Sequence, residues 1–181
     1  MSTRRDKNSF WRAESTWQRA QRVPDCLPLR IERFTGVRSE IRALFEQADD
    51  SPDQIDGYID TGEVLVARRK GELVGHVQFV CSGVCCEIKS IAVLGSFQRQ
   101  GIGTSLVRSA LQCAILGGCT QLVVSTATAD IGNLRFYQRM GFRMDRVERD
   151  VFTTDRGYPV LEANGIPVRD RVWFSIDITR G

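Results

Sequence analysis

Histidine is almost absent from this sequence, because His76 is the only one among 181 residues. The chain has six cysteines, which are Cys26, Cys81, Cys85, Cys86, Cys113 and Cys119. They lack histidine partners and do not form two pairs at zinc-finger spacing, so we expect no metal site. A chain of this length can fold without disulfide staples, so we expect reduced thiols in a cytoplasmic protein. His76 lies in a strand pattern and is expected to be structural.

Long apolar runs and strong net charge are also missing. No run approaches the roughly 20 apolar residues that a membrane-spanning helix needs, and no apolar segment follows the basic residues near the N-terminus. We therefore expect neither membrane association nor a secretory signal. The formal net charge of +3 is too small to favour nucleic acid as a partner. A basic excess lies within residues 1–22, where a solvated tail is the simpler interpretation.

The rest of the composition is that of one globular domain. Hydrophobic residues make up 42% of the chain and charged residues 26%, and the length suits one domain better than two. We expect residues 1–28 to form an N-terminal extension, in which a short helix ends at Pro24 and Pro28. Residues 29–181 are expected to form the domain itself.

The spacing of apolar residues predicts strands and helices in mixed order. Strands are expected at residues 29–34, 64–68, 73–81, 87–93, 121–125, 143–152 and 171–178. Helices are expected within residues 37–61, with an interruption at Ser51 and Pro52, then from Gly103 to Gly117, and at residues 133–140. The predicted loop at residues 153–170 is long for a compact domain, and such loops are usually functional.

The strongest local signal is the glycine turn that runs from Gln98 to Thr104. It follows a predicted strand and opens a predicted helix, so its backbone can approach a ligand closely. The free N–H groups of a helix start favour a phosphate, and Arg99 adds a positive charge. The turn is not a P-loop, because no lysine follows Gly103, and it is not a dinucleotide fingerprint, because Leu106 stands where a small residue is required.

Two segments together carry a family resemblance. The first combines Ser90-Ile91-Ala92-Val93 with Gln98-x-x-Gly101-x-Gly103, and the second runs from Asn133 to Gly141-Phe142. Both resemble motifs of the GCN5-related N-acetyltransferase (GNAT) superfamily, and the resemblance extends over about residues 29–178. It implies an α/β fold of the α+β type, with a central, mostly antiparallel mixed sheet flanked by helices.

The same resemblance implies acetyl-CoA as the cofactor and assigns residues to it. The implied cofactor-binding residues are Ile91, Ala92, Val93, Gln98, Arg99, Gln100, Gly101, Ile102, Gly103, Thr104, Asn133 and Tyr137. Backbone groups of Ile91 and Val93 would pair with the pantetheine arm like an added strand. Asn133 would contact the cofactor near the pyrophosphate, and Tyr137 would lie close to the sulfur.

The expected reaction is direct acetyl transfer to an amine. A free alkylamine has a pKa of about 10.4 and attacks only when neutral, so a base is needed. Glu87 is the candidate base, because this family often places a glutamate at the start of that strand; a solvated glutamate is the equal alternative. Tyr137 is the candidate general acid for the leaving thiolate. Cys85 and Cys86 could suggest an acyl-enzyme, but no base is evident for them.

Acidic residues before the hairpin bear on the acceptor. Six carboxylates lie close together, at Asp49, Asp50, Asp53, Asp56, Asp60 and Glu63. They predict a small cationic molecule or a basic peptide as the acceptor, although an ordinary polar helix face has the same composition. The loop from Gly157 to Ile166 could close the same site.

Another class of function stays open. Domains of this fold can bind acetyl-CoA as sensors or scaffolds without catalysis, but the intact glycine turn and Tyr137 favour an enzyme. A dinucleotide-dependent oxidoreductase is disfavoured by Leu106 and by the predicted antiparallel hairpins. The sequence leaves both a monomer and a homodimer open.

Overall fold

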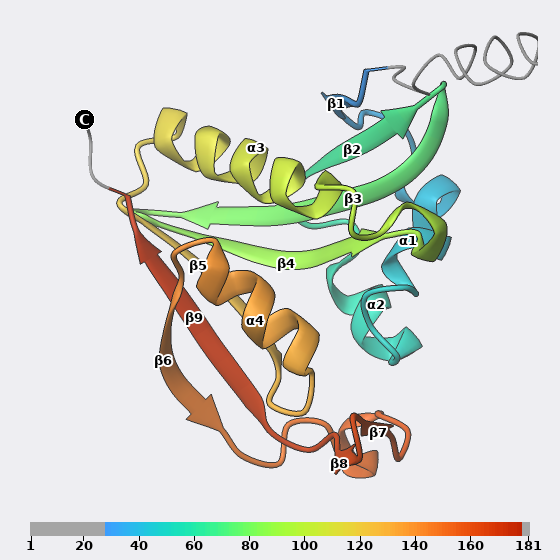
Figure 1. Ribbon diagram of the computed structural model, residues 1–181, viewed down its shortest axis with the longest axis vertical. Coiled ribbons are helices and arrows are strands. Elements are labelled where there is room, and N and C mark those ends of the chain that lie inside the picture. The colour runs from blue at the N-terminus through green and yellow to red at the C-terminus, as the bar shows by residue number, and fades with distance from the viewer. Residues whose placement is uncertain (1–27, 179–181) are drawn as a thin grey trace, which may run out of the picture.

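The computed structural model describes residues 28–178, and the predicted N-terminal extension up to residue 27 lies outside this range. Seven strands form one sheet in the order β1-β2-β3-β4-β5-β9-β6, with helices on both of its faces (Figure 1). Only the pair β4–β5 is parallel. The predicted fold, a mostly antiparallel mixed sheet flanked by helices, is confirmed.

The first half of the sheet is an antiparallel meander. Its strands are β1 (Arg30–Arg33), β2 (Glu63–Arg69), β3 (Glu72–Ser82) and β4 (Cys85–Val93). Lys70 and Gly71, which join β2 to β3, both have positive φ angles, of 53° and 85°. A two-residue turn of this kind matches the twist of the strands that it connects, so the predicted hairpin is confirmed.

The second half of the sheet departs from chain order. The last strand, β9 (Arg171–Asp177), lies between β5 (Gln121–Ala127) and β6 (Arg143–Glu148), and is antiparallel to both. The predicted strand at residues 143–152 is too long. The chain leaves the sheet after Glu148 and turns at Asp150, whose φ of 57° is tolerated by aspartate better than by most residues.

Strands β4 and β5 pair over only part of their length. Their parallel register runs from Cys85 and Gln121 to Ile88 and Val124, and it ends there. Beside this end β4 carries a bulge, because Ser90 pairs with Gln78 and Ile88 pairs with Phe79, which leaves Lys89 as an extra residue. The two strands then diverge (Figure 1), so one edge of β4 is left without a partner strand.

Two hydrophobic cores lie on the two faces of the sheet. On one face, α3 (Ile102–Leu116) and α4 (Ile131–Arg139) cover a core that includes Leu106 of α3, Phe79 of β3 and Phe174 of β9. On the other face, a short 3-10 helix (Arg38–Ile41), α1 (Arg42–Phe45) and α2 (Pro52–Tyr58) bury Phe45 and Ile55 against β2. Another 3-10 turn, Gly95–Phe97, leads from β4 to the glycine turn.

The side chain of Ser51 accepts a hydrogen bond from the backbone N–H of Gln54, with Pro52 in the first turn of α2, as the sequence predicts. The predicted long loop contains a 3-10 turn (Thr154–Arg156) and the small hairpin of β7 (Glu162–Ala163) and β8 (Ile166–Pro167). No helix within residues 28–178 is long and apolar enough to span a membrane.

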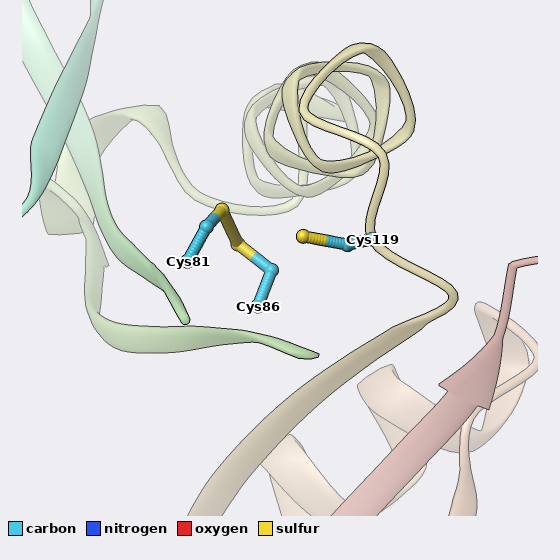
Figure 2. A group of neighbouring side chains, drawn as sticks. All are labelled: Cys81, Cys86 and Cys119. Carbon is cyan, nitrogen blue, oxygen red and sulfur yellow. A yellow bond between two sulfur atoms is a disulfide. The ribbon is translucent and has the colours of Figure 1, made fainter. Parts of the chain in front are cut away.

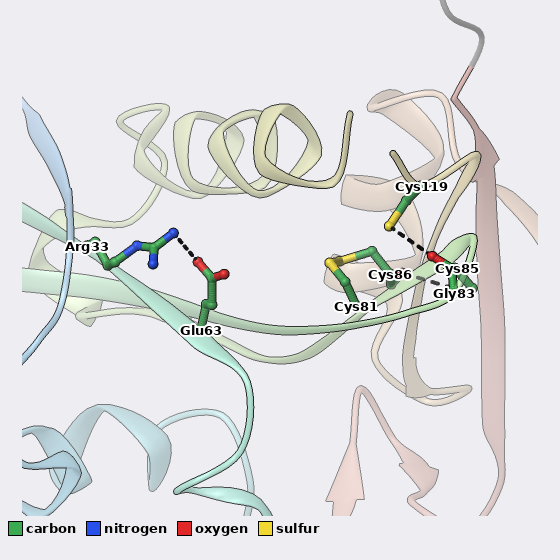
Figure 3. Close-up of a disulfide and its surroundings, with 7 residues drawn as sticks. All are labelled: Arg33, Glu63, Cys81, Gly83, Cys85, Cys86 and Cys119. Atoms are coloured by element: carbon green, nitrogen blue, oxygen red, sulfur yellow. Dashed lines mark hydrogen bonds and ion pairs between the residues drawn. A yellow bond between two sulfur atoms is a disulfide. The ribbon is translucent and has the colours of Figure 1, made fainter. Parts of the chain in front are cut away.

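The cysteines correct one expectation. Cys81 of β3 and Cys86 of β4 face each other across the hairpin and form a disulfide, whereas reduced thiols were expected (Figure 2). Their opposed positions in the antiparallel register bring the two side chains together, and this pairing is not visible in a linear sequence. Cys119 lies beside the disulfide at the end of the connection from α3 (Figure 3).

Candidate active site

The glycine turn gives α3 an open N-terminus. Arg99 and Gly101 both adopt left-handed backbone angles, with φ of 59° and 82°, and Gly101 is the N-cap residue. No side chain of the described residues caps this end of α3, whereas Ser51 and Asp130 cap α2 and α4. The first N–H groups of the long helix α3 are therefore available to an anion such as a pyrophosphate.

A groove of about 710 Å³ runs along this turn. It brings together eleven of the twelve residues predicted to bind the cofactor, namely Ile91, Ala92, Val93, Gln98, Arg99, Gly101, Ile102, Gly103, Thr104, Asn133 and Tyr137. Gln100 is the exception. Its side chain donates a hydrogen bond to the carbonyl of Ser96 at 3.1 Å and accepts one from Arg69, outside the groove.

A second cavity, of about 260 Å³, occupies the opening between β4 and β5. Its walls include residues 88–91 of β4 and residues 124–127 of β5. Six residues line both the groove and the cavity, namely Ala48, Asp50, Ile91, Asp130, Asn133 and Tyr137. A ligand in the groove can thus meet a second ligand in the cavity beside these residues.

Tyr137 lies at this junction and is only 2% exposed. It comes from α4, and its ring packs edge-on against Phe136 and Phe142, with centroid distances of 5.1 and 5.8 Å. Burial, with a smaller contribution from Asp130, raises the pKa of Tyr137 above its usual value. The phenol therefore keeps its proton at ordinary pH and can donate it.

Asn133 is fixed by the cap of α4. Its backbone N–H donates to Asp130 Oδ1 at 2.9 Å, and its side-chain amide donates to Asp130 Oδ2 at 2.8 Å and to Thr126 Oγ1 at 3.2 Å. Two hydrogen bonds hold this side chain, and a third holds its backbone, at the junction where the resemblance places a cofactor contact.

Two polar contacts lead away from the cavity wall, one at Asp49 and one at Ser90. The hydroxyl of Tyr58 donates to Asp49 Oδ2 at 3.4 Å. Ser90 Oγ lies 2.9 Å from Nε2 of the buried His76. Burial chiefly raises the pKa of Asp49, although the N–H of Ser51 at 3.0 Å opposes this shift.

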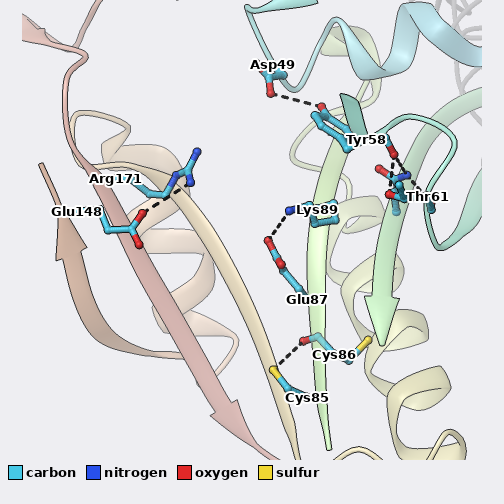
Figure 4. A network of polar contacts seen from close by, with 10 residues as sticks. Asp49, Tyr58, Thr61, Cys85, Cys86, Glu87, Lys89, Glu148 and Arg171 are labelled. Atoms are coloured by element: carbon cyan, nitrogen blue, oxygen red, sulfur yellow. Dashed lines mark hydrogen bonds and ion pairs between the residues drawn. The ribbon is translucent and has the colours of Figure 1, made fainter. Parts of the chain in front are cut away.

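Glu87, the predicted base, lies outside this arrangement. It forms an ion pair with Lys89 at 3.0 Å and is not among the residues that line the cavity (Figure 4). Lys89 itself lines the cavity, as does Arg171 from β9. Arg171 makes a long ion pair of 3.7 Å with Glu148, and its buried Nε has no hydrogen-bond partner among the described residues.

Only part of the predicted cluster of six carboxylates lies at the site. Asp49 and Asp50 line the cavity, but the other four carboxylates do not. Asp56 forms an ion pair with Arg42, and Glu63 pairs with Arg33 at 2.6 Å. The long loop contributes Tyr158 and four more residues to the cavity wall, namely Pro159, Leu161, Ala163 and Val168.

Several site residues were not predicted individually. Ser90 was noted only as part of a motif and Tyr158 only as part of a loop, whereas Tyr58 and Arg171 carry no local signal. The nearest signals were the length of the loop that contains Tyr158 and the position of Arg171 at the start of a predicted strand. Their convergence depends on the divergence of β4 from β5 and on the place of β9 between β5 and β6.

The comparison with known families agrees with this geometry. Residues 31–142, which are more than half of the chain, match the profile described as the acetyltransferase (GNAT) family. The chain belongs to this family. The uncharacterized N-acetyltransferase YvbK of Bacillus subtilis is 34% identical over 151 residues, which cover 83% of this chain and 97% of the relative.

Solved structures of similar proteins have the same fold. A B. subtilis acetyltransferase in complex with CoA is 32% identical and has a TM-score of 0.77, covering 84% of this chain and all of the other. A GNAT family acetyltransferase from Elizabethkingia anophelis with acetyl-CoA bound is 28% identical, with a TM-score of 0.75 over 83% of this chain and 98% of the other.

Family membership defines the enzyme class. The chain is an N-acetyltransferase, and acetyl-CoA is the acyl donor of its family. The residues present fit this cofactor, because the uncapped start of α3 and the left-handed turn at Arg99 and Gly101 suit a pyrophosphate. The unpartnered edge of β4 is suited to bind an extended chain.

Proposed function

We propose that the enzyme transfers the acetyl group of acetyl-CoA directly to a primary amine of a small molecule or peptide. The observation that carries this proposal is the junction of two spaces, a cofactor-sized groove and a smaller cavity, at Tyr137. Two reactants that meet there would be held for a reaction that otherwise depends on chance encounter in solution.

The chain would hold the cofactor mainly through its backbone. When bound, acetyl-CoA supplies an activated acetyl thioester. The N–H groups at the start of α3 would hold the pyrophosphate, and Arg99 would add charge. The free edge of β4 at Ile91 and Val93 would pair with the pantetheine amides, which orients the thioester towards the cavity.

Tyr137 would act as the general acid. The leaving thiolate has a basicity similar to that of a cysteine side chain, with a pKa of about 8.5. A buried phenol that keeps its proton can transfer it to this sulfur as the C–S bond breaks. Asn133, fixed by Asp130 and Thr126, would position the cofactor beside Tyr137.

Asp49 is better placed than Glu87 to accept the proton of the amine. Asp49 lines the cavity and is half-buried, and its raised pKa makes it a stronger base than an exposed aspartate. Tyr58 contacts one of its carboxylate oxygens and would orient it. Glu87 stays a prediction, and its pairing with Lys89 disfavours it as the base.

The charged residues around the cavity favour an acceptor amine that carries few positive charges. Asp49 and Asp50 can attract the ammonium form of the acceptor, in line with the predicted cationic substrate. Lys89 and Arg171 add positive charge to the same cavity. A single amine with a neutral or acidic far end fits this wall better than a polycation does.

An amine screen that follows the release of free CoA thiol tests the proposal. We expect one group of primary amines to be acetylated by the intact chain and much more slowly by Asp49→Asn. Asp60→Asn is the matched control, because Asp60 is exposed and does not line the cavity. Tight binding of acetyl-CoA without acetylation of any amine would instead support a sensor or scaffold.

A further inference from the structure

Three cysteine sulfurs converge at the end of the sheet where the β3–β4 hairpin turns. Cys81, Cys86 and Cys119 place their Sγ atoms within 4.8 Å of one another (Figure 2). Cys86 is at the opposite end of β4 from Val93, which lines the cofactor groove. This cluster is therefore separate from the acetyltransferase site.

Backbone pairing positions all three side chains. Cys81 and Cys86 are partners in the antiparallel register of β3 and β4. The segment that carries Cys119 is joined to the hairpin by hydrogen bonds from the N–H groups of Thr120 and Gln121 to the carbonyl of Val84, at 2.7 and 3.2 Å. The fold thus places the backbone of Cys119 beside the hairpin, and its Sγ lies 4.0 Å from the carbonyl oxygen of Gly83 (Figure 3).

All three candidate ligand atoms are cysteine sulfurs, which are soft donors. In the described part of the chain, the cluster contains three cysteines and no carboxylate or imidazole. Thiolates select thiophilic ions such as Zn²⁺ and Cu⁺ over hard ions such as Mg²⁺. Zinc–sulfur bonds of about 2.3 Å place tetrahedrally arranged sulfurs roughly 3.8 Å apart, which lies within the 4.8 Å that limits the separations of these three sulfurs.

We propose that the reduced chain binds one thiophilic metal ion through Cys81, Cys86 and Cys119. Cys86 and Cys119 are buried, whereas Cys81 is exposed and marks the side from which the ion enters. Each thiol gives up its proton to solvent as its sulfur binds the ion. The fourth coordination position is left to a water or a small external thiol on the exposed side.

The disulfide is the alternative state of the same site. When Cys81 and Cys86 are joined, two of the three thiolates are no longer available, and Cys119 alone does not hold an ion. The oxidised chain is therefore expected to bind weakly. An external dithiol that reduces the disulfide to two thiols, and is itself oxidised to a disulfide, is expected to create the site. This makes the oxidised protein an internal control.

The experiment is a titration of the reduced, full-length chain with Cd²⁺ and then with Zn²⁺. The readouts are the thiolate-to-metal charge-transfer absorption and the thermal midpoint of unfolding. We expect saturation at one ion per chain, a higher thermal midpoint, and binding about 10-fold or more weaker in Cys119→Ser. Cys113→Ser is the matched control, because Cys113 is a free cysteine outside the cluster, and it should bind like the unmodified chain.

Cys81→Ser is a second variant that removes a ligand. Because Cys81 is exposed, this substitution disturbs folding less than a substitution of the buried Cys119. It should also weaken binding while leaving acetyl-CoA affinity unchanged. The proposal is overturned if the reduced chain takes up no Cd²⁺. It is equally overturned if Cys81→Ser and Cys119→Ser bind as tightly as the unmodified chain, or if the oxidised chain binds as tightly as the reduced one.

Discussion

The buried histidine makes a quantitative prediction about stability. His76 lies in the core, 2.9 Å from Ser90 Oγ and with its ring centroid 4.3 Å from that of Phe45. Burial, with a smaller contribution from Arg38, lowers the pKa of His76 from 6.5 to about 3. Because the folded state resists protonation, the contribution of neutral His76 is complete above a pH of about 6.5 and is lost as the pH falls towards about 3.

The magnitude follows from the difference between the two pKa values. Between a pH of about 7 and a pH of about 4.5, the unfolded chain protonates His76 while the folded chain does not, which removes about 2.5 kcal/mol from the free energy of unfolding. A His76→Met variant keeps a side chain of similar size without this titration. Asp49 and the other carboxylates titrate in both proteins and cancel in the comparison.

The assay is urea unfolding of both proteins at these two pH values. The stability of the unmodified chain relative to His76→Met should fall by about 2.5 kcal/mol between the higher and the lower pH. A difference that stays constant with pH would contradict this prediction, because it would mean that His76 titrates alike in the folded and unfolded chains.

Three further predictions concern the reaction and the extension. Tyr137→Phe should lower turnover by roughly 10² to 10⁴ with little change in acetyl-CoA affinity, and full activity would make the tyrosine structural. Because burial raises the pKa of Asp49 and a base must be deprotonated, kcat/KM should fall as the pH drops through that pKa; the same acid limb in Asp49→Asn would exclude this residue as its source. Removal of residues 1–27 should leave acetyl-CoA binding intact in calorimetry, and loss of binding would show that the extension supports the domain.

Local features of the fold were predictable from the sequence. The glycine turn, the face of α3 that carries Leu106, and the cap at Ser51 each depend on residues that are neighbours along the chain. The boundary of β6 was not predicted, because Val151 is buried although it lies beyond the end of the strand. Apolar character alone does not show whether a buried residue belongs to a strand or to the segment that follows it.

Contacts between distant segments could not be predicted. The groove is the exception, because two sequence motifs form it, and eleven of the residues that line it were therefore predicted to bind the cofactor. The cavity depends on where β4 stops pairing with β5, and on β9, which brings Arg171 to the site from the end of the chain. The role of the acids was predicted only in part, because Asp56 and Glu63 form ion pairs with arginines elsewhere in the sequence.

The binding of acetyl-CoA at the start of α3 can be tested directly by substitution of a glycine there. Gly103 lines the groove and has no left-handed backbone angle, and a Cβ there would make only ordinary contacts with Phe136 at 3.5 Å. Gly103→Val should therefore fold and yet obstruct the groove. Gly57→Val, another helical glycine without a left-handed angle and outside the groove, is its control.

The measurement is the affinity for acetyl-CoA, determined by calorimetry, of the unmodified chain, Gly103→Val and Gly57→Val. We expect a loss of affinity of about 10-fold or more in Gly103→Val, equivalent to at least about 1.4 kcal/mol, and unchanged affinity in Gly57→Val. Equal affinity in Gly103→Val and the unmodified chain would contradict the placement of the cofactor at this turn.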